Sequence, residues 1–106
     1  MEKEMYLDPI PPGEILREDF MIPYEISINQ LGRDLDVPPN RISGIVNGKH
    51  SITADTALRL ECYFGVEAQF WLNLQSEYDL RIARRKSEKL IKERILSHRS
   101  IELVAV

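Results

Sequence analysis

Amide, hydroxyl and basic side chains recur at short intervals between residues 27 and 51, and these types suit contacts with DNA. Arg41 can donate two hydrogen bonds to one guanine in the major groove, and Asn40 can contact a base or a phosphate. The alternative for Arg41 is a solvated surface arginine. The predicted DNA-contacting residues are Ser27, Asn29, Gln30, Pro39, Asn40, Arg41, Ser43, Asn47, Lys49 and Ser51.

The residues on either side of Arg41 suit contacts with the DNA backbone. Asn29 and Gln30 lie at the start of a predicted helix, where they and the exposed amides can donate to phosphates. The alternative is that they only cap this helix. Lys49 and Ser51 follow the next helix and can hold the opposite strand. Phosphate contacts carry little sequence information, so base selection is expected mainly from Arg41.

Two short helices must position this set. Apolar residues recur at helical spacing over 28–35 and again over 42–46. Residues 36–38 leave no room for a strand between them, so the helices must cross steeply, as in a helix-turn-helix. An ordinary helical hairpin is the alternative, but its outer face would more often carry Glu and Lys. The second helix is expected to begin at Pro39, and its predicted outward residues are Asn40, Arg41, Ser43, Gly44 and Asn47.

Prolines and capping residues divide the rest of the chain. Three prolines predict an extended arm over residues 1–11, followed by a first helix over residues 12–21. Ser27 is expected to cap the helix that follows it by accepting from an amide of its first turn. Thr53 is expected to cap a fourth helix over residues 54–64 in the same way.

The last predicted helix is unusually long. The apolar pattern from Glu67 continues at helical spacing to about Ser97, and its second half has only a narrow apolar edge. The tail at 101–106 is apolar and β-branched, which predicts a short strand. A lone strand needs a partner, so residues 79–106 are expected to mediate dimerisation.

Composition indicates one globular domain. The chain has 106 residues, of which 43% are hydrophobic and 29% charged. No apolar run approaches the ~20 residues of a membrane span, and the acidic start argues against a signal peptide. The single cysteine, Cys62, fits a reducing cytoplasm and is expected to be a small core residue.

The net charge of −3 conceals a polarised distribution. Residues 1–25 carry seven acidic and two basic side chains, whereas residues 81–99 carry eight basic and two acidic ones. Local charge decides phosphate contact, so the negative total does not exclude DNA. The basic run has three interpretations that the sequence leaves open: phosphate contact, an acidic partner, or a solvated helix face.

The sequence contains no motif that predicts catalysis. His50, His98 and Cys62 form no nucleophile–base arrangement, and no metal-ligand or phosphate-loop spacing occurs, so we expect neither an enzyme nor a cofactor or metal site. The aromatic residues at the start of the last helix could stack on single-stranded bases, but their helical spacing favours the core. These residues are Phe70, Trp71 and Tyr78.

A string of motifs closely resembles the HigA/VapI antitoxins, which belong to the Cro/C1-type (XRE) helix-turn-helix family. The motifs are PGEILREDF at 12–20, VPPNRIS at 37–43, IVNGK at 45–49, ITADTALRL at 52–60 and FWLNLQ at 70–75. The resemblance covers about residues 12–83. It implies a five-helix domain that binds its own operator as a dimer and neutralises a HigB-type toxin, a small mRNA endonuclease.

Several positions depart from the family pattern. Gly32 replaces the usual Ala of the second helix, and Asp36 replaces the usual Gly of the turn, where Asp still tolerates a left-handed backbone. Gly44 stands where relatives commonly carry an acid or amide that faces bases, so direct base contact is expected to be absent there. Glu67 replaces the usual Ser or Thr cap of the last helix.

Together these features predict an all-α, lambda-repressor-like helix-turn-helix domain over residues 12–78, with an extended last helix and a possible C-terminal strand. The predicted function is a cytoplasmic DNA-binding antitoxin that represses its own operon. The alternatives are a repressor without a toxin partner, and a toxin-sequestering module without operator binding. Because the toxin class is basic, its expected contact surface is acidic and comprises Glu2, Glu4, Asp8, Glu14, Glu18, Asp19, Glu25, Glu61 and Glu67.

Overall fold

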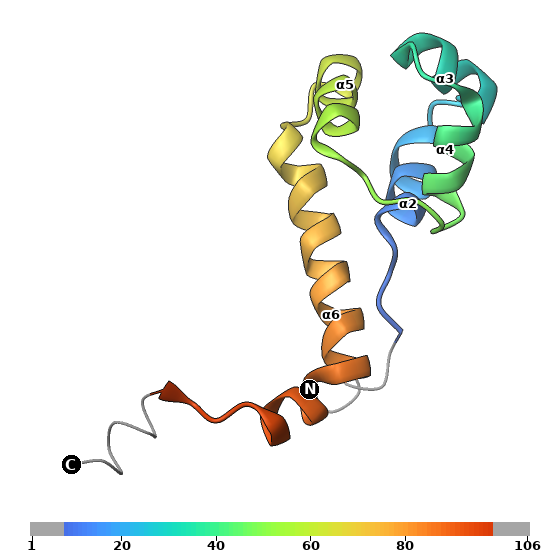
Figure 1. Ribbon diagram of the computed structural model, residues 1–106. Helices are drawn as coiled ribbons and strands as arrows, with labels where there is room; N and C mark the ends of the chain where they lie inside the picture. The colour runs from blue at the N-terminus through green and yellow to red at the C-terminus, as the bar shows by residue number, and fades with distance from the viewer. Residues whose placement is uncertain (1–7, 99–106) are drawn as a thin grey trace.

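Helices joined by short loops make up residues 8–98, which are the part of the chain that the computed structural model describes (Figure 1). The expected all-α class is confirmed, since residues 8–98 contain no strand. The strand predicted at 101–106 lies outside the described residues. The elements in order are α2 (Pro12–Ile15), η1 (Leu16–Met21), α3 (Ile28–Leu35), α4 (Pro39–Val46), α5 (Ala54–Phe64) and α6 (Ala68–Arg94).

The first helix begins at Pro12 as predicted, but it widens into the π-helical η1 from Leu16. The Ile22 amide donates to the Arg17 carbonyl five residues earlier at 2.9 Å. Both Leu16 and Met21 are buried. Five residues of an α-helix turn through one full circle and about 140° more, which would point these side chains apart. The wider π turn brings them closer to one face, and this bulge was not foreseen.

The turn between α3 and α4 forms as predicted. Ser27 caps α3 by accepting from the Gln30 amide at 3.1 Å. Asp36 adopts the left-handed conformation, with φ of 58°, and the Val37 amide donates to the Gly32 carbonyl at 2.9 Å. A Cβ atom at Gly32 would lie 3.0 Å from Pro39 Cα, so the two helices approach closely here.

The core lies where α2 and η1, α3, α4, α5 and the first turns of α6 meet. Its buried apolar residues are Leu16, Met21, Leu31, Leu35, Val37, Ile42, Ile45, Ile52, Ala57, Leu60 and Trp71. Thr53 caps α5 by accepting from the Thr56 amide at 3.3 Å, which confirms the predicted cap.

Two expectations about the core need correction, the first in part and the second entirely. Trp71 is fully buried and packs against Phe20 with ring centroids 4.8 Å apart, but Phe70 is 37% exposed at the rim of this cluster and Tyr78 is half-buried. Cys62 is exposed rather than in the core, because α5 turns its Ala57–Leu60 stripe inward and Cys62 lies on another face.

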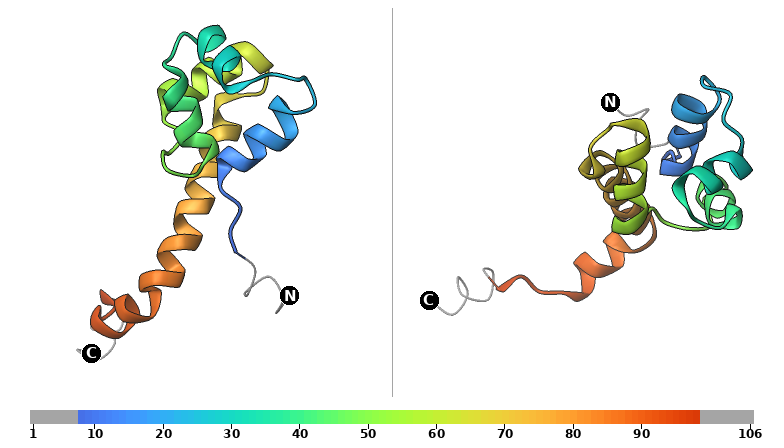
Figure 2. Two further views of the ribbon diagram at one scale, coloured as in Figure 1. Left: turned by 90° about the vertical axis from the view of Figure 1, so that its right-hand side faces the viewer. Right: turned by 90° about the horizontal axis from the view of Figure 1, so that it is seen from above.

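The long helix α6 extends beyond the other helices (Figures 1 and 2). Glu67 provides no side-chain cap, as its type predicts, but Glu61 from α5 accepts a hydrogen bond from the Ala68 amide at 2.7 Å. The helix ends at Arg94, a little before the expected position, and spans 27 residues. Asp8 of the arm pairs with Arg85 of this helix at 2.9 Å.

Gly13 fixes the distance between α2 and α4. A Cβ atom at this position would overlap the carbonyl oxygen of Ile45 and lie 2.9 Å from Val46 Cα. Both of these atoms belong to the backbone of α4, so a larger residue would have to separate the two helices.

We therefore expect Gly13→Ala to lower the free energy of unfolding by about 1–3 kcal/mol, as overpacking does. Helix propensity favours Ala by up to about 1 kcal/mol, which the backbone overlap outweighs. Denaturant unfolding followed by circular dichroism measures the change. Glu14→Ala, at the exposed neighbouring position, is the control and should stay within about 0.5 kcal/mol of the parent. An unchanged midpoint for Gly13→Ala would contradict the close approach.

Candidate nucleic-acid interface

The outer face of α4 carries most of the residues that the sequence assigned to DNA binding. Ile42 and Ile45 enter the core, which leaves Asn40, Arg41 and Asn47 exposed. Ser43 is half-buried, and its hydroxyl accepts from Asn47 Nδ2 at 3.3 Å. Pro39 is the first residue of the helix, where its missing N–H costs nothing.

A first hollow joins the start of α3 to α4. It is lined by Ser27, Ile28, Asn29, Pro39, Asn40 and Ser43. The N-terminus of a helix leaves backbone amides without intrahelical acceptors and carries a partial positive charge, so it favours a phosphate. The structure thus brings together five predicted residues from two helices at a place that suits one phosphate. Gln30 contributes its backbone amide to the Ser27 cap and its side chain is half-buried.

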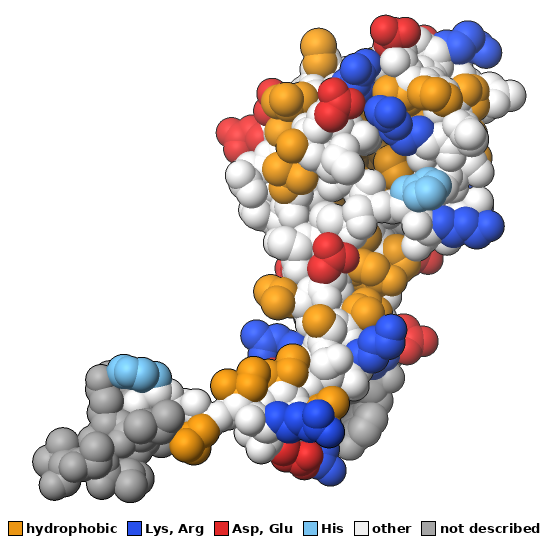
Figure 3. All heavy atoms as spheres, viewed as in Figure 1, with side chains coloured by type: hydrophobic (Ala, Val, Ile, Leu, Met, Phe, Trp, Pro, Cys, Tyr) orange, Lys and Arg blue, Asp and Glu red, His pale blue; other side chains and the backbone are white. Residues whose placement is uncertain are grey.

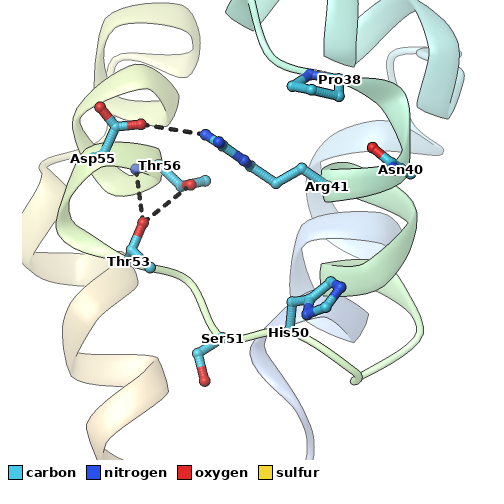
Figure 4. Close-up of a pocket in the computed structure, with 8 residues that line it drawn as sticks. All are labelled: Pro38, Asn40, Arg41, His50, Ser51, Thr53, Asp55 and Thr56. Carbon is cyan, nitrogen blue, oxygen red and sulfur yellow. Dashed lines mark hydrogen bonds and ion pairs between the residues drawn. The ribbon is translucent and has the colours of Figure 1, made fainter.

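A second hollow lies on the other side of Asn40, between α4 and α5 (Figure 4). Arg41 extends across it, and its Nη1 atom lies 3.4 Å from Asp55 Oδ2 on α5. The hollow is lined by Pro38, Asn40, Arg41, His50, Ser51, Thr53, Asp55 and Thr56. Every lining residue except Pro38 has a polar or charged side chain that can form hydrogen bonds, so the hollow can accommodate the edge of a nucleic acid.

Arg59 connects this hollow to the turn before α4. Its Nε atom donates to Asp55 Oδ2 at 2.9 Å, and its Nη1 atom donates to the Leu35 carbonyl at 2.8 Å. A second, longer bond from Nη1 reaches the Asp36 carbonyl at 3.3 Å. Arg59 therefore closes the C-terminus of α3, and its role is structural.

The loop after α4 is anchored at both ends. The amides of Lys49 and His50 donate to the Gly44 carbonyl at 2.8 and 3.0 Å, and Gly48 is left-handed with φ of 76°. At the far end the Ile52 amide donates to the buried Gln75 Oε1 atom at 2.8 Å. Lys49 and Ser51 are both exposed on this loop.

Gly44 lies on the side of α4 that carries Asn40 and Arg41, but the expectation that it is exposed there was wrong. Gly44 is buried, because the imidazole ring of His50 folds over it. Its missing side chain is thus explained by packing within the protein.

Sequence reasoning assigned no role to four residues that shape this site: His50, Asp55, Arg59 and Gln75. One of them carried a visible signal. Gln75 follows Trp71 by one helical turn, so a polar residue occupies the apolar, core-facing side of the helix, where it needs a hydrogen-bond partner. The other three residues contact partners in different elements, and no spacing in the sequence predicts these contacts.

Several side chains of the basic run on α6 form ion pairs with carboxylates. Arg84 and Lys92 both lie within ion-pair distance of Glu88, at 2.6 and 3.9 Å, and Arg81 lies 3.8 Å from Glu77. These pairs are exposed and spaced four residues apart. This pattern favours a solvated helix face over phosphate contact.

Among the residues that the structure describes, one titratable group has a clearly shifted pKa. Tyr63 on α5 donates its hydroxyl hydrogen to Asp34 Oδ2 on α3 at 2.7 Å. This hydrogen bond, with smaller effects from desolvation and the negative charge of Asp34, raises the pKa of Tyr63 above 10.0. Because the folded pKa is raised, the contact stabilises α3 against α5 below the ordinary tyrosine pKa and is lost in stronger alkali.

Within residues 8–98, no group of three or more His, Cys, Asp or Glu side chains is placed to hold a metal ion. No helix in the same range is both long and apolar enough to cross a membrane.

The steeply crossed α3 and α4, with a polar outer face on α4, define a helix-turn-helix protein. Residues 18–71 match the helix-turn-helix family HTH_3. Virulence-associated protein I of Dichelobacter nodosus is 49% identical over 81 residues, which cover 76% of this chain and 75% of that protein. Antitoxin HigA-1 of Vibrio cholerae is 32% identical, with 76% of each chain covered.

Solved structures give the same result. A HigA-family addiction module antidote protein from Coxiella burnetii has a TM-score of 0.81 and 48% identity, covering 87% of this chain and all of that one. Pseudomonas aeruginosa antitoxin HigA with the higBA promoter has a TM-score of 0.82 and 44% identity, covering 85% and 98%. The chain belongs to the HigA/VapI antitoxin family of helix-turn-helix proteins.

Gln75 holds the loop that carries Lys49 and Ser51. Gln75→Leu leaves the Ile52 amide buried without its acceptor, and we expect a loss of about 1–3 kcal/mol in the free energy of unfolding. Thermal or denaturant unfolding measures this loss. Gln69→Leu is the matched control, since Gln69 lies on the exposed face of the same helix. Equal unfolding midpoints for the two variants would show that Gln75 does not anchor the loop.

Proposed function

We propose that this protein is an antitoxin that binds the operator of its own operon and neutralises a HigB-type mRNA endonuclease. It acts by binding rather than catalysis, in the cytoplasm where its DNA target lies. The observation that carries the proposal is the face of α4, where exposed Asn40 lines both hollows and exposed Arg41 extends across the second. The Pseudomonas aeruginosa HigA structure that contains the higBA promoter supports the DNA partner.

The proposed mechanism is occlusion of the promoter. Two copies of α4 enter successive major grooves of DNA about one helical turn apart, roughly 34 Å. Arg41 and Asn40 contact base edges, while Ser27, Asn29 and Lys49 contact phosphates. RNA polymerase is then excluded from the same stretch of DNA.

A dimer is needed for this geometry, and we place its interface in residues 79–106. The exposed stripe on α6 includes Leu80, Leu90 and Ile91, whose side chains are 56%, 51% and 49% exposed. Figure 3 shows such apolar side chains beside Lys and Arg side chains over the lower half of α6. Pairing two such stripes about a dyad would bury them.

The alternative in which operator binding has been lost relied on Gly44. Because His50 covers Gly44, the absence of a side chain there does not indicate a defective DNA face. A repressor without a toxin partner remains the second candidate, and the neighbouring open reading frame distinguishes it.

A gel shift with the chain's own promoter region tests the proposal. We expect a shift at lower protein concentration for this duplex than for a random duplex of equal length, with affinity falling as salt rises. Equal affinity for both duplexes at every salt concentration would overturn operator binding.

Arg41→Ala should weaken operator binding by roughly 1–3 kcal/mol per half-site and relax the base preference there. Lys49→Ala should weaken binding to all duplexes alike and flatten the dependence of affinity on salt, as the loss of one phosphate contact does. Fluorescence anisotropy on operator and random duplexes measures both variants. Losses that are equal on both duplexes for both variants would remove the distinction between base and phosphate contacts.

Leu90→Glu with Ile91→Glu should convert the dimer to a monomer, because four carboxylates would meet at the proposed dyad. Sedimentation equilibrium measures the mass of each form. Lys86→Glu with Lys89→Glu is the control for added negative charge on α6 and should remain dimeric. A dimer in the Leu90 and Ile91 variant would place the interface elsewhere.

Toxin neutralisation should survive Arg41→Ala, because we place the toxin on the acidic surface at the other side of the domain. Glu14, Glu18 and Asp19 are exposed there. Reversing these three charges should weaken growth rescue on co-expression with the toxin, since opposite charge steers the encounter rather than supplying most of the affinity. Rescue by the charge-reversed variant, together with failure of the Arg41 variant, would mean that the toxin binds the face that we assign to DNA.

A further inference from the structure

His50 occupies the space that a side chain at position 44 of α4 would fill. A Cβ atom at Gly44 would overlap His50 Cδ2 and would lie 2.8 Å from Nε2 and 2.9 Å from Cγ. The Cδ2 edge of the ring therefore rests on the backbone of α4. Because Cδ2 lies closest and Nε2 and Cγ flank it, the remaining ring atoms, Nδ1 and Cε1, form the edge turned away from Gly44.

Hydrogen bonds of the loop fix the backbone around His50. The His50 amide donates to the Gly44 carbonyl at 3.0 Å, so the backbone of His50 is bonded to the residue that its ring covers. Two residues later the Ile52 amide is fixed by Gln75 on α6 at 2.8 Å. A side chain whose backbone is already fixed costs less entropy to order when it binds a ligand.

The ring also lies on the proposed DNA face. Position 44 follows Arg41 and Asn40 by about one helical turn, so the three positions share one face of α4. The His50 ring, which covers position 44, therefore lies on the same face as the Arg41 and Asn40 side chains. His50 is exposed and lines the same hollow as Arg41 and Asn40 (Figure 4). Arg41 and Asp55, which also line this hollow, are paired with each other.

We propose that His50 is a specificity-determining residue that contacts a base edge next to the one contacted by Arg41. An imidazole N–H can donate to N7 of a purine or O6 of a guanine in the major groove. In this arrangement the loop after α4 supplies a base contact that the helix, with Gly44, does not supply itself. The inference deepens the proposed operator binding and relies on it.

The test uses the full-length chain, its promoter duplex, and a series of duplexes in which one base pair at a time is changed. We expect His50→Ala to weaken promoter binding by about 3- to 10-fold per half-site, the loss expected for one hydrogen bond. Binding to random duplex should not change. Discrimination should disappear at a base pair different from the one affected by Arg41→Ala.

Gly44→Ala supplies a second, independent variant. Its methyl group displaces the His50 ring, so it should reproduce the loss, and the double variant should lose little more than either single one. Circular dichroism confirms that each variant is folded.

Three outcomes would overturn the inference. They are unchanged discrimination at every base pair in His50→Ala, an equal loss on promoter and random duplex, and additive losses in the double variant. If the parent chain prefers its promoter, these results leave the proposed function intact. If the parent shows no preference, both the proposed function and this inference fail.

Discussion

The DNA face depends on how α4 is held across α3, and that crossing depends on the turn at Asp36. Its left-handed conformation, with φ of 58°, costs roughly 1–2 kcal/mol for a residue with a side chain. The turn repays this cost by bonding the Val37 amide to the Gly32 carbonyl. Arg59 then satisfies the carbonyl oxygens of Leu35 and Asp36, which the end of α3 would otherwise leave open. Hydrogen bonds from Arg59 of α5 therefore stabilise the turn, and the direction in which α4 leaves Pro39 is fixed.

The same arginine connects the turn to the residue that we expect to select bases. One oxygen of Asp55 accepts from Arg59 and also lies 3.4 Å from Arg41. The Arg41 and Asp55 side chains are 43% and 60% exposed, and surface pairs of this kind contribute at most about 1 kcal/mol. Arg41 can therefore exchange this carboxylate for a guanine at small cost, while Arg59 keeps the turn closed. Asp55 holds Arg41 extended across the hollow in the free protein and leaves it available to DNA.

Local patterns in the sequence predicted most of the fold, because helix caps and turns depend on neighbouring residues. Ser27, Thr53 and the left-handed turn at Asp36 all behave as their types predict. The features that escaped prediction depend on contacts between distant elements. Helical spacing predicts that Gly44 is exposed, but the loop after α4 places His50 over it. Residue type predicts that Cys62 is in the core, but Ala57 and Leu60 orient α5 so that Cys62 is exposed. The π-helical η1 likewise serves to bury both Leu16 and Met21, a demand that only the assembled core imposes.

The most direct test of the account is an NMR titration of the isotope-labelled full-length chain with its promoter duplex. The account predicts that backbone amide shifts change most in two stretches, residues 27–30 and 39–51, which carry the two hollows and the loop. Shifts over residues 81–94 of α6 should be small, because Arg81, Arg84 and Lys92 are engaged in ion pairs along the helix. Large changes confined to residues 81–94, with α4 unaffected, would contradict the central claim that this protein binds DNA through its helix-turn-helix.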